Sequence, residues 1–499
     1  MRKLQLRVAR MLALATLLLS AISLHSQGSV TWSASMDVAQ SSYDNLHPRI
    51  AVDGSGNPLI IWGRTSDESV FISRWTGSSF SMPMKVNPSG YTVATQSWMG
   101  PDIAAQGDTV FVVVKRTPEA SDTNHVFILR SLNGGMTFGN PVQVDAIADS
   151  ISRFPTLDVD ALGNPLVAFM KFDPSFGNAR WVVAKSTDGG NSFASDQLAS
   201  GWSGGTVCDC CPGSIVIDGN TACMSYRDNL NNIRDTWTGI STNGGISFGQ
   251  GMPVDQGNWM LMKCPSSGPD GVIIGDSLYS VFMSQESGSP LVYLSKSSIS
   301  TAQGAVGVPI IGTQIGITSQ NFPRIASNGP AVAVVWRQNF NMNAQIPILF
   351  TDNIQDGFPA DYDSVFVGTG MTAAVNVDVA ISNGMVHVVW QDDASGTVRY
   401  RSGSFAPFVN VPKPRQVDFM LYPNPTRGAV NVLATGALLH NRVDLQVRNF
   451  AGKEVLAQNL MELPETFSIS TEGWAAGVYF VSLTSDHEIF SKKLIVLPR

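Results

Sequence analysis

The chain has 499 residues, of which 43% are hydrophobic and 14% charged, and it contains 46 Gly and 27 Pro. Its length suits two or three domains, its low charge excludes a disordered chain, and it lacks the Ala, Glu, Lys and Leu content of a long helical protein. A net charge of −7 argues against a general nucleic-acid binder, and we expect no nucleic-acid partner.

The first residues have the features of a secretory signal peptide. Four basic residues precede an apolar run over 11–22, which is too short to span a bilayer. We therefore predict that residues 1–26 form a signal peptide; an N-terminal membrane anchor is the alternative. Residues 1–26 hold four Lys or Arg and no Asp or Glu, so their removal takes the net charge from −7 to −11. No other apolar stretch is long enough for a membrane helix, so we expect no integral membrane span.

Seven segments share one pattern: a short first strand, a small turn and a second apolar strand. They begin between 52 and 57 residues apart, at Pro48, Pro101, Pro155, Pro212, Pro269, Pro323 and Val375. A period near 50 built from short strands is typical of a β-propeller with four antiparallel strands in each blade. We predict an all-β propeller over 27–411, with seven blades favoured over six. A strand within 30–38 is expected to pair with the seventh unit and close the ring.

Three predicted turns between third and fourth strands carry the same eight-residue motif, 55 residues apart. Residues 186–193 fit S-x-D-x-G-x-[ST]-[FW] with Asp188, and the motifs at 131–138 and 241–248 carry Asn133 and Asn243 at that position. An Asp or Asn here bonds its own backbone, and Gly accepts a positive φ. These motifs resemble the Asp-box of the sialidase-like (BNR-repeat) propellers. That resemblance implies a structural role for the three residues, on the face opposite the usual ligand site.

The C-terminal eighty residues follow a different pattern. A Pro-rich segment over 412–420 is predicted to be a linker, and alternating apolar residues over 421–499 predict a β-sandwich of about seven strands. The ordered motifs Y-P-N-P from Tyr422, A-G-K from Ala451, G-V-Y from Gly477 and K-K-L-I-V from Lys492 resemble the type IX secretion system C-terminal sorting domain of Bacteroidetes. The resemblance implies export by that machinery, as a partner, to the medium or to the outer cell surface. A generic glycan-binding sandwich is the alternative.

Basic residues recur directly after the predicted second strands, at the end where propellers bind ligands. They are Arg64, Arg116, Lys171, Arg227 and Arg337, while Arg49 and Arg324 stand at the start of first strands. Converging guanidinium groups suit an acidic sugar, because each can hold a carboxylate through two hydrogen bonds. The alternative is that these cations pair with nearby carboxylates such as Glu68, Asp228 or Asp392.

The first unit carries a further resemblance to sialidases. Pro48-Arg49-Ile50 is similar to the strand that supplies one Arg of their carboxylate-binding triad, and Asp67 stands where their acid/base Asp is expected. The seven units and Ala51, where that family has Pro, depart from the sialidase pattern.

A sialidase also needs a Tyr nucleophile paired with a Glu. Only Glu68, Glu119 and Glu286 lie between 27 and 412, and Glu286 is our candidate. The tyrosine is not assigned, because Tyr43, Tyr226 and Tyr400 compete for the role.

All five cysteines lie in the fourth unit and the loop after it. Cys208, Cys210 and Cys211 precede one first strand, and Cys264 holds the equivalent place one blade later. In an exported chain disulfides are the default, so we expect Cys208 or Cys210 to pair with Cys264 across two blades, with Cys223 buried. A thiolate site for Zn²⁺ or Cu⁺ is the alternative, although C-x-C-C is not a standard zinc spacing.

The polar loop that follows Tyr226 lies beside these cysteines. It carries two Arg-Asp pairs, Arg227-Asp228 and Arg234-Asp235, and is a candidate ligand site.

Three functions fit these features. The first is an exported or cell-surface propeller that recognises acidic glycans, with hydrolysis of terminal sialic acid left open; no cofactor is expected. The second is a non-catalytic propeller that binds glycans or proteins. The third is a metal- or redox-dependent propeller that uses the cysteine cluster.

Overall fold

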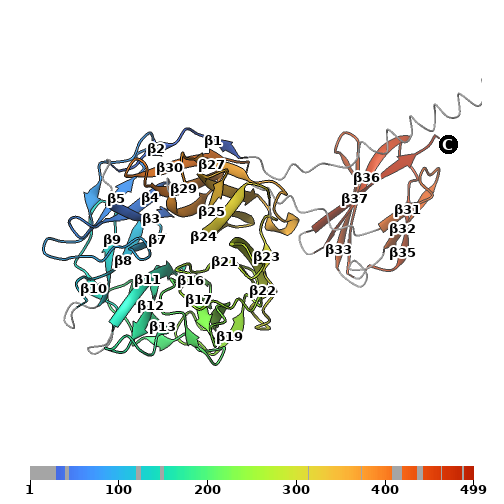
Figure 1. Cartoon of the computed structure of the whole chain (residues 1–499). Coiled ribbons are helices and arrows are strands. Elements are labelled where there is room, and N and C mark those ends of the chain that lie inside the picture. Colours follow the sequence, from blue (N-terminus) through green and yellow to red (C-terminus); the bar gives the residue numbers. More distant parts are fainter. Residues whose placement is uncertain are drawn as a thin grey trace, which may run out of the picture. The chain divides into compact units, whose positions relative to one another are not determined.

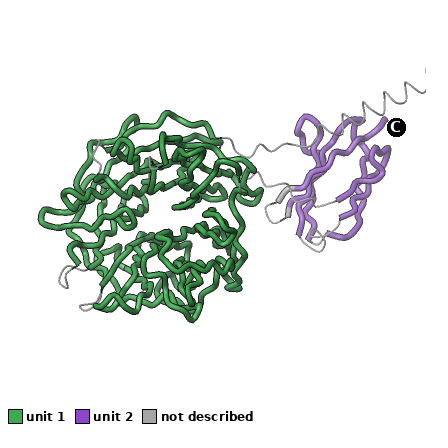
Figure 2. The backbone as a smooth tube through the Cα atoms, viewed as in Figure 1, with its two compact units in different colours: residues 1–408 green, residues 409–499 purple. Residues whose placement is uncertain are grey.

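The computed structural model describes most of the chain, and the predicted signal peptide, Tyr43 and most of the predicted linker lie outside the described residues. The described ranges are 30–39, 44–119, 125–145, 151–312, 314–371, 374–406, 419–434, 442–461, 463–485 and 488–498. They divide into two compact units, residues 1–408 and 409–499 (Figure 2).

The first unit is a propeller of seven antiparallel sheets, called blades 1 to 7, which follow one another around a ring in chain order (Figure 1). The inner strands are β3 (Asn45–Val52), β7 (Asp102–Gln106), β11 (Ile151–Val159), β16 (Ser214–Asp218), β20 (Asp270–Ile274), β24 (Ile317–Asn328) and β28 (Val375–Ser382). The second strands are β4 (Pro58–Arg64), β8 (Thr109–Lys115), β12 (Pro165–Phe172), β17 (Thr221–Asn229), β21 (Ser277–Ser284), β25 (Ala331–Phe340) and β29 (Met385–Asp392). The predicted seven-bladed, all-β propeller is confirmed.

Two further strands complete each sheet. The third strands are β5 (Ser69–Arg74), β9 (Val126–Ser131), β13 (Arg180–Lys185), β18 (Thr236–Ser241), β22 (Leu291–Ser298), β26 (Asn343–Thr351) and β30 (Thr397–Ser404). The outer strands of blades 1 to 6 are β6 (Met84–Lys85), β10 (Val142–Gln143), β14 (Gln197–Leu198), β19 (Gln250–Pro253), β23 (Val308–Pro309) and β27 (Asp363–Val367). Blade 4 has an extra strand, β15 (Thr206–Val207), paired with β17.

The N-terminal strands close the ring. β1 (Thr31–Trp32) and β2 (Met36–Asp37) both pair with β30 of blade 7, with Trp32 opposite Gly403. They supply the outer strand of a blade whose other three strands come from the end of the propeller. This closure leaves β30 without a free edge.

The second strands are apolar because each blade packs between two others. β12 is buried along its whole length, and Trp62, Trp336 and Trp390 are fully buried on the second strands of blades 1, 6 and 7. A strand covered on both faces has a continuous apolar sequence, not an alternating one.

Carboxylates on four inner strands tie neighbouring blades together. Each accepts a hydrogen bond from a backbone N–H of the next blade's inner strand: Leu157 to Asp102, Ile217 to Asp158, Ile325 to Asp270 and Ile50 to Asp378, at 2.8–3.3 Å.

The Asp-box turns lie between third and outer strands, on the face opposite the start of the inner strands. The Oδ1 atom of Asp188 accepts the backbone N–H of Ser192 at 2.9 Å and of Asn191 at 3.0 Å. Hydrogen bonds, chiefly from Ser192, lower the pKa of Asp188 to about 2. The Oδ1 atoms of Asn133 and Asn243 accept the corresponding N–H groups of Thr137 and Ser247.

The second unit is a small sandwich of two sheets. The strand orders are β31-β32-β35 and β34-β33-β36-β37, and Val432, Val447 and Val481 are fully buried between the sheets. The strands are β31 (Phe419–Tyr422), β32 (Ala429–Ala434), β33 (Val443–Asn449), β34 (Glu454–Leu460), β35 (Thr466–Ser470), β36 (Gly477–Ser485) and β37 (Glu488–Val496). Among the described residues, no helix is long and apolar enough to cross a membrane.

Candidate functional site

A cavity of about 70 Å³ lies at the centre of the propeller, where the inner strands begin; we call this end the upper face. All seven blades contribute to its wall, and Arg49 of blade 1 and Arg324 of blade 6 are its two guanidinium groups. One water needs about 10–15 Å³ of volume open to its centre, so the cavity can hold several waters or a group the size of a carboxylate.

The backbone is strained around the mouth of this cavity. His47, Phe154, Phe322 and Asn376 have φ between 48° and 58°, and each lies at a register shift of its inner strand. All four line the cavity. Positive φ in a non-glycine residue costs about 1–3 kcal/mol, and such residues cluster at functional sites.

The two cavity arginines have different surroundings. Arg324 donates from Nε to Asp378 Oδ1 at 2.9 Å and lies 3.4 Å from Asp270. These carboxylates raise the Arg324 pKa above its ordinary value although burial opposes them.

Arg49 has no carboxylate within ion-pair distance among the described residues. It donates to the carbonyl of Pro48 at 2.9 Å and to Nε2 of His47 at 2.8 Å. Burial, and then the charge of Arg324, lower the Arg49 pKa. Burial, followed by Arg49 and Arg324, holds the His47 pKa well below 6.5, so this imidazole is neutral and accepts from Arg49.

The other predicted ligand-binding arginines do not line this cavity. Arg64 lies over the ring of Phe71 at 4.1 Å, Arg116 lies over Tyr91 at 4.4 Å, and Arg337 donates to the carbonyl of Met371. The expected convergence of arginines therefore reduces to Arg49 and Arg324. The sequence signal that Arg49 and Arg324 share is the Pro-Arg-Ile in the inner strands of blades 1 and 6.

Arg227 differs most from the expectation, because its side chain is fully buried. Its three nitrogens donate to the carbonyls of Ser267, Arg234 and Met283 at 2.6–3.1 Å. Strand β17 continues to Asn229, where β15 covers it, so this position lies inside a sheet. Because this side chain is 0% exposed, a ligand on the surface of the propeller cannot reach Arg227.

Asp228 and Arg234 are also largely enclosed in blade 4. Asp228 is 1% exposed, and burial raises its pKa to about 6. Arg234 is 8% exposed, and its Nε donates to the carbonyl of Leu261. Both residues support the loops beside the cysteines and do not form an open ligand site.

The predicted catalytic carboxylates lie apart. Asp67 is on the β4–β5 hairpin of blade 1 and Glu286 on the β21–β22 hairpin of blade 5, and these blades are not adjacent in the ring.

None of the named tyrosines or glutamates that the structure describes lines the central cavity. The hydroxyl of Tyr226 accepts a hydrogen bond from the Gly201 N–H, and that of Tyr400 contacts Nδ1 of His387 at 2.6 Å. Glu119 is held by Arg153 through two hydrogen bonds of 2.6 and 2.7 Å, while Glu68 is exposed on the β4–β5 hairpin. Glu286 contacts the hydroxyl of Tyr293. Burial raises the pKa of Tyr293, whereas a tyrosine that acts as a nucleophile would need a lowered pKa.

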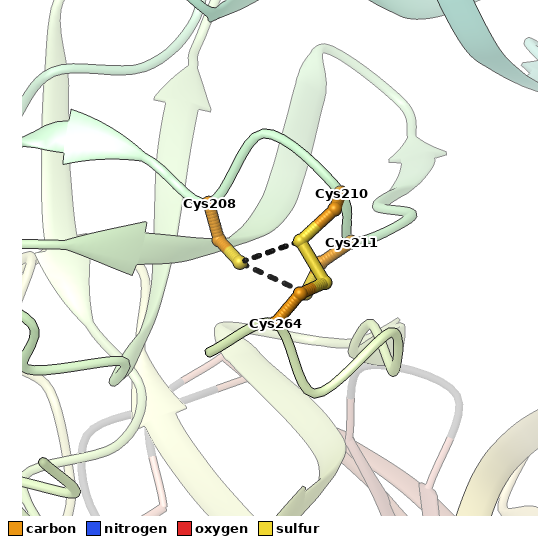
Figure 3. Close-up of side chains that lie close together, drawn as sticks. All are labelled: Cys208, Cys210, Cys211 and Cys264. Atoms are coloured by element: carbon orange, nitrogen blue, oxygen red, sulfur yellow. Dashed lines mark hydrogen bonds between the residues drawn. A yellow bond between two sulfur atoms is a disulfide. The ribbon is translucent and has the colours of Figure 1, made fainter. Parts of the chain in front are cut away.

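Four cysteines form a second cluster on the loops that precede the inner strands of blades 4 and 5 (Figure 3). Cys210 and Cys264 form a disulfide. The Cys208 sulfur lies 3.1 Å from that of Cys211 and 3.7 Å from that of Cys210. Cys211 lowers the Cys208 pKa to about 7, while burial raises that of Cys211. Cys223 is buried in β17, apart from this cluster.

Fold and site define an exported class of protein: a seven-bladed β-propeller followed by a secretion module. Residues 420–497 match the family described as the secretion system C-terminal sorting domain, which confirms the resemblance seen in the sequence. This domain indicates export, to the medium or to the outer cell surface. A comparison with curated proteins finds no significant match.

Solved structures with similar folds share little sequence with this chain. A protein of unknown function from Dyadobacter fermentans DSM 18053 is 10% identical, covering 75% of this chain and 99% of that chain, with a TM-score of 0.47. An ulvan lyase bound to a glucuronate-rhamnose sulfate saccharide is 10% identical, covering 75% and 95%, with a TM-score of 0.48. A Trypanosoma rangeli sialidase is 11% identical, covering 93% and 89%, with a TM-score of 0.40. The propeller assignment rests on the strand pairing of this chain, because these TM-scores are below 0.5.

Proposed function

We propose that the propeller binds acidic glycans outside the cell, with a sugar carboxylate held by Arg49 in the central cavity. The observation that carries this proposal is a partly buried guanidinium with no carboxylate partner among the described residues, lining a cavity that fits one carboxylate group. A desolvated cation gains most from an anion that binds through charge-assisted hydrogen bonds.

Recognition is favoured over hydrolysis by the composition of the cavity wall. The described residues that line it include no Tyr and no Glu, the nucleophile and partner that a sialidase uses. Arg324 is paired with Asp270 and Asp378. Asp102, the carboxylate that lines the cavity, accepts hydrogen bonds from Thr156 and Leu157. Arg49 is therefore the cavity guanidinium that has no ion-pair partner among the described residues. The glycan beyond its carboxylate then lies over the upper face, on the loops around the cavity mouth.

The test is retention of a mixed library of sialylated, uronic-acid and neutral oligosaccharides by the purified protein, read by mass spectrometry. We expect acidic members to be retained intact, and Arg49→Gln to reduce their retention at least tenfold. Arg337→Gln is the matched control, because Arg337 is an upper-face arginine outside the cavity. Failure to retain acidic members, or equal effects of both variants, would contradict the proposal. Release of a terminal acidic sugar would establish the hydrolase alternative instead.

A further inference from the structure

The cysteine cluster has the composition and spacing of a metal site. The Sγ atoms of Cys208, Cys210, Cys211 and Cys264 all lie within 4.8 Å of one another (Figure 3). They come from two loops that belong to different blades, and Cys208 and Cys211 are buried while Cys210 and Cys264 are half-buried. A disulfide between the two loops needs only two cysteines, so Cys208 and Cys211 are not required for it.

The distances suit a tetrahedral ion. A Zn–S bond of about 2.3 Å places the sulfurs of a regular four-thiolate site about 3.8 Å apart. The distance between the Cys208 and Cys210 sulfurs is 3.7 Å, and that between Cys208 and Cys211 is 3.1 Å. After reduction, the Cys210 and Cys264 sulfurs, which are bonded in the disulfide, must move apart to about 3.8 Å, and the Cys211 sulfur must shift outward.

We propose that the reduced protein binds one Zn²⁺ ion through the thiolates of Cys208, Cys210, Cys211 and Cys264. Binding displaces one proton from each of four thiols, and all four ligands come from protein, so the site is closed and structural. The ion would join the loops before blades 4 and 5. The disulfide between Cys210 and Cys264 joins the same loops when the metal is absent.

Two buried cations offset the charge of such a centre. Four thiolates and one divalent ion carry a net charge of −2, which is costly in a buried site without compensation. Arg227 is 0% exposed and Arg234 is 8% exposed, and the charges of both act on the Cys208 sulfur. The three hydrogen bonds of Arg227 to backbone carbonyls fix its position, and one of them, to Ser267, anchors the loop that carries Cys264.

Metal and disulfide exclude each other, because Cys210 and Cys264 cannot serve in both. Reduction of the disulfide takes up two electrons and two protons and yields two thiols. In the test a phosphine supplies the electrons and becomes the phosphine oxide, with its oxygen taken from water. A count of five free thiols in the unfolded protein verifies that reduction is complete.

The experiment titrates the reduced full chain with Co²⁺ under anaerobic conditions, then with Zn²⁺. We expect one Co²⁺ per chain with the visible absorption of tetrahedral cobalt–thiolate, displaced by one Zn²⁺. X-ray absorption at the zinc edge should show four sulfur neighbours in the wild-type protein. This measurement needs no variant and stays decisive if a substitution prevents folding.

Two variants locate the ion. Cys211→Ser should weaken Co²⁺ binding at least tenfold, whereas Cys223→Ser, which removes a buried cysteine outside the cluster, should not change it. No metal uptake, fewer than three sulfur neighbours, or loss of binding in Cys223→Ser would overturn the proposal. Loss of the fold on reduction without recovery on Zn²⁺ addition, or binding of Cu⁺ in place of the divalent ions, would also overturn it.

Discussion

Acidic side chains crowd one part of the upper face, between blades 4 and 5. Asp255 is 2% exposed, its Oδ1 accepts the Gly257 N–H at 3.0 Å, and its Oδ2 has no hydrogen-bond partner among the residues that the structure describes. Burial, and then the charge of Asp235, raise the Asp255 pKa from 3.8 to about 7. The folded protein therefore binds this proton more tightly than the unfolded chain does.

We predict that Asp255→Asn stabilises the protein at pH 8 but not at pH 4. As the pH rises from about 4 to about 7, the wild type loses stability progressively, because Asp255 ionises in the unfolded chain at a lower pH than in the folded protein. One pH unit between the two pKa values corresponds to about 1.4 kcal/mol, so the gain reaches up to about 4 kcal/mol. Urea unfolding at both pH values measures it, with the exposed Asp108→Asn as control. A gain that is equal at both pH values would contradict the assigned cause.

The ion pair of Asp378 with Arg324, at 2.9 Å, is shorter than that of Asp270 with Arg324, at 3.4 Å. Asp378 is 4% exposed, and it also accepts the Ile50 N–H of blade 1 at 3.0 Å. Removing the charge of Asp378 leaves Arg324 with Asp270, at 3.4 Å, as its one remaining ion-pair partner among the described residues, and a buried charge with less compensation is costly.

We predict that Asp378→Asn lowers the free energy of unfolding by about 3 kcal/mol. Asp37→Asn is the matched control, since Asp37 pairs with Arg399 at 3.3 Å but its side chain is 61% exposed, and it should cost below about 1 kcal/mol. Chemical denaturation of both variants gives the comparison. Similar losses in the two would show that burial does not set the strength of the central pair.

At the scale of elements, the loops before blades 4 and 5 approach each other at backbone distance. A Cβ atom at Gly268 would lie 2.0 Å from the carbonyl oxygen of Pro212. We predict that Gly268→Ala destabilises the protein by about 1–3 kcal/mol, because the backbone of Pro212 cannot move aside as easily as the end of a flexible side chain. Gly249→Ala is the control, since a Cβ there meets nothing within 4 Å. Thermal unfolding tests this, and equal midpoints for the two variants would show that the loops move apart freely.

The sequence predicted these elements well where one pattern repeats. The repeat of 52–57 residues located all seven inner and second strands, because every blade buries the same two strands in the same way. It did not predict the left-handed bulges at Phe154 and Phe322, because Phe does not favour a positive φ. It also placed Arg227 on a loop, because the extra strand β15 that covers it is only two residues long.

At the scale of the whole molecule, the propeller depends on its closure by β1 and β2. We predict that a chain beginning at residue 40 loses cooperative unfolding and aggregates, because β30 then exposes an open edge. A chain ending at residue 408 should keep the wild-type propeller transition, because the second unit forms its own core. Calorimetry with light scattering distinguishes them. An unchanged transition in the first chain would mean that the ring closes without these strands.

The central claim is that a carboxylate in the central cavity, bound by Arg49, holds the glycan. The most direct test is isothermal titration of the purified protein with a sialylated oligosaccharide and with its methyl ester, which differ only in the carboxylate charge. We predict that esterification weakens binding at least tenfold in the wild type but has little further effect in Arg49→Gln. Equal affinity of the wild-type protein for the acid and the ester would contradict the account, because binding would then not depend on the carboxylate charge.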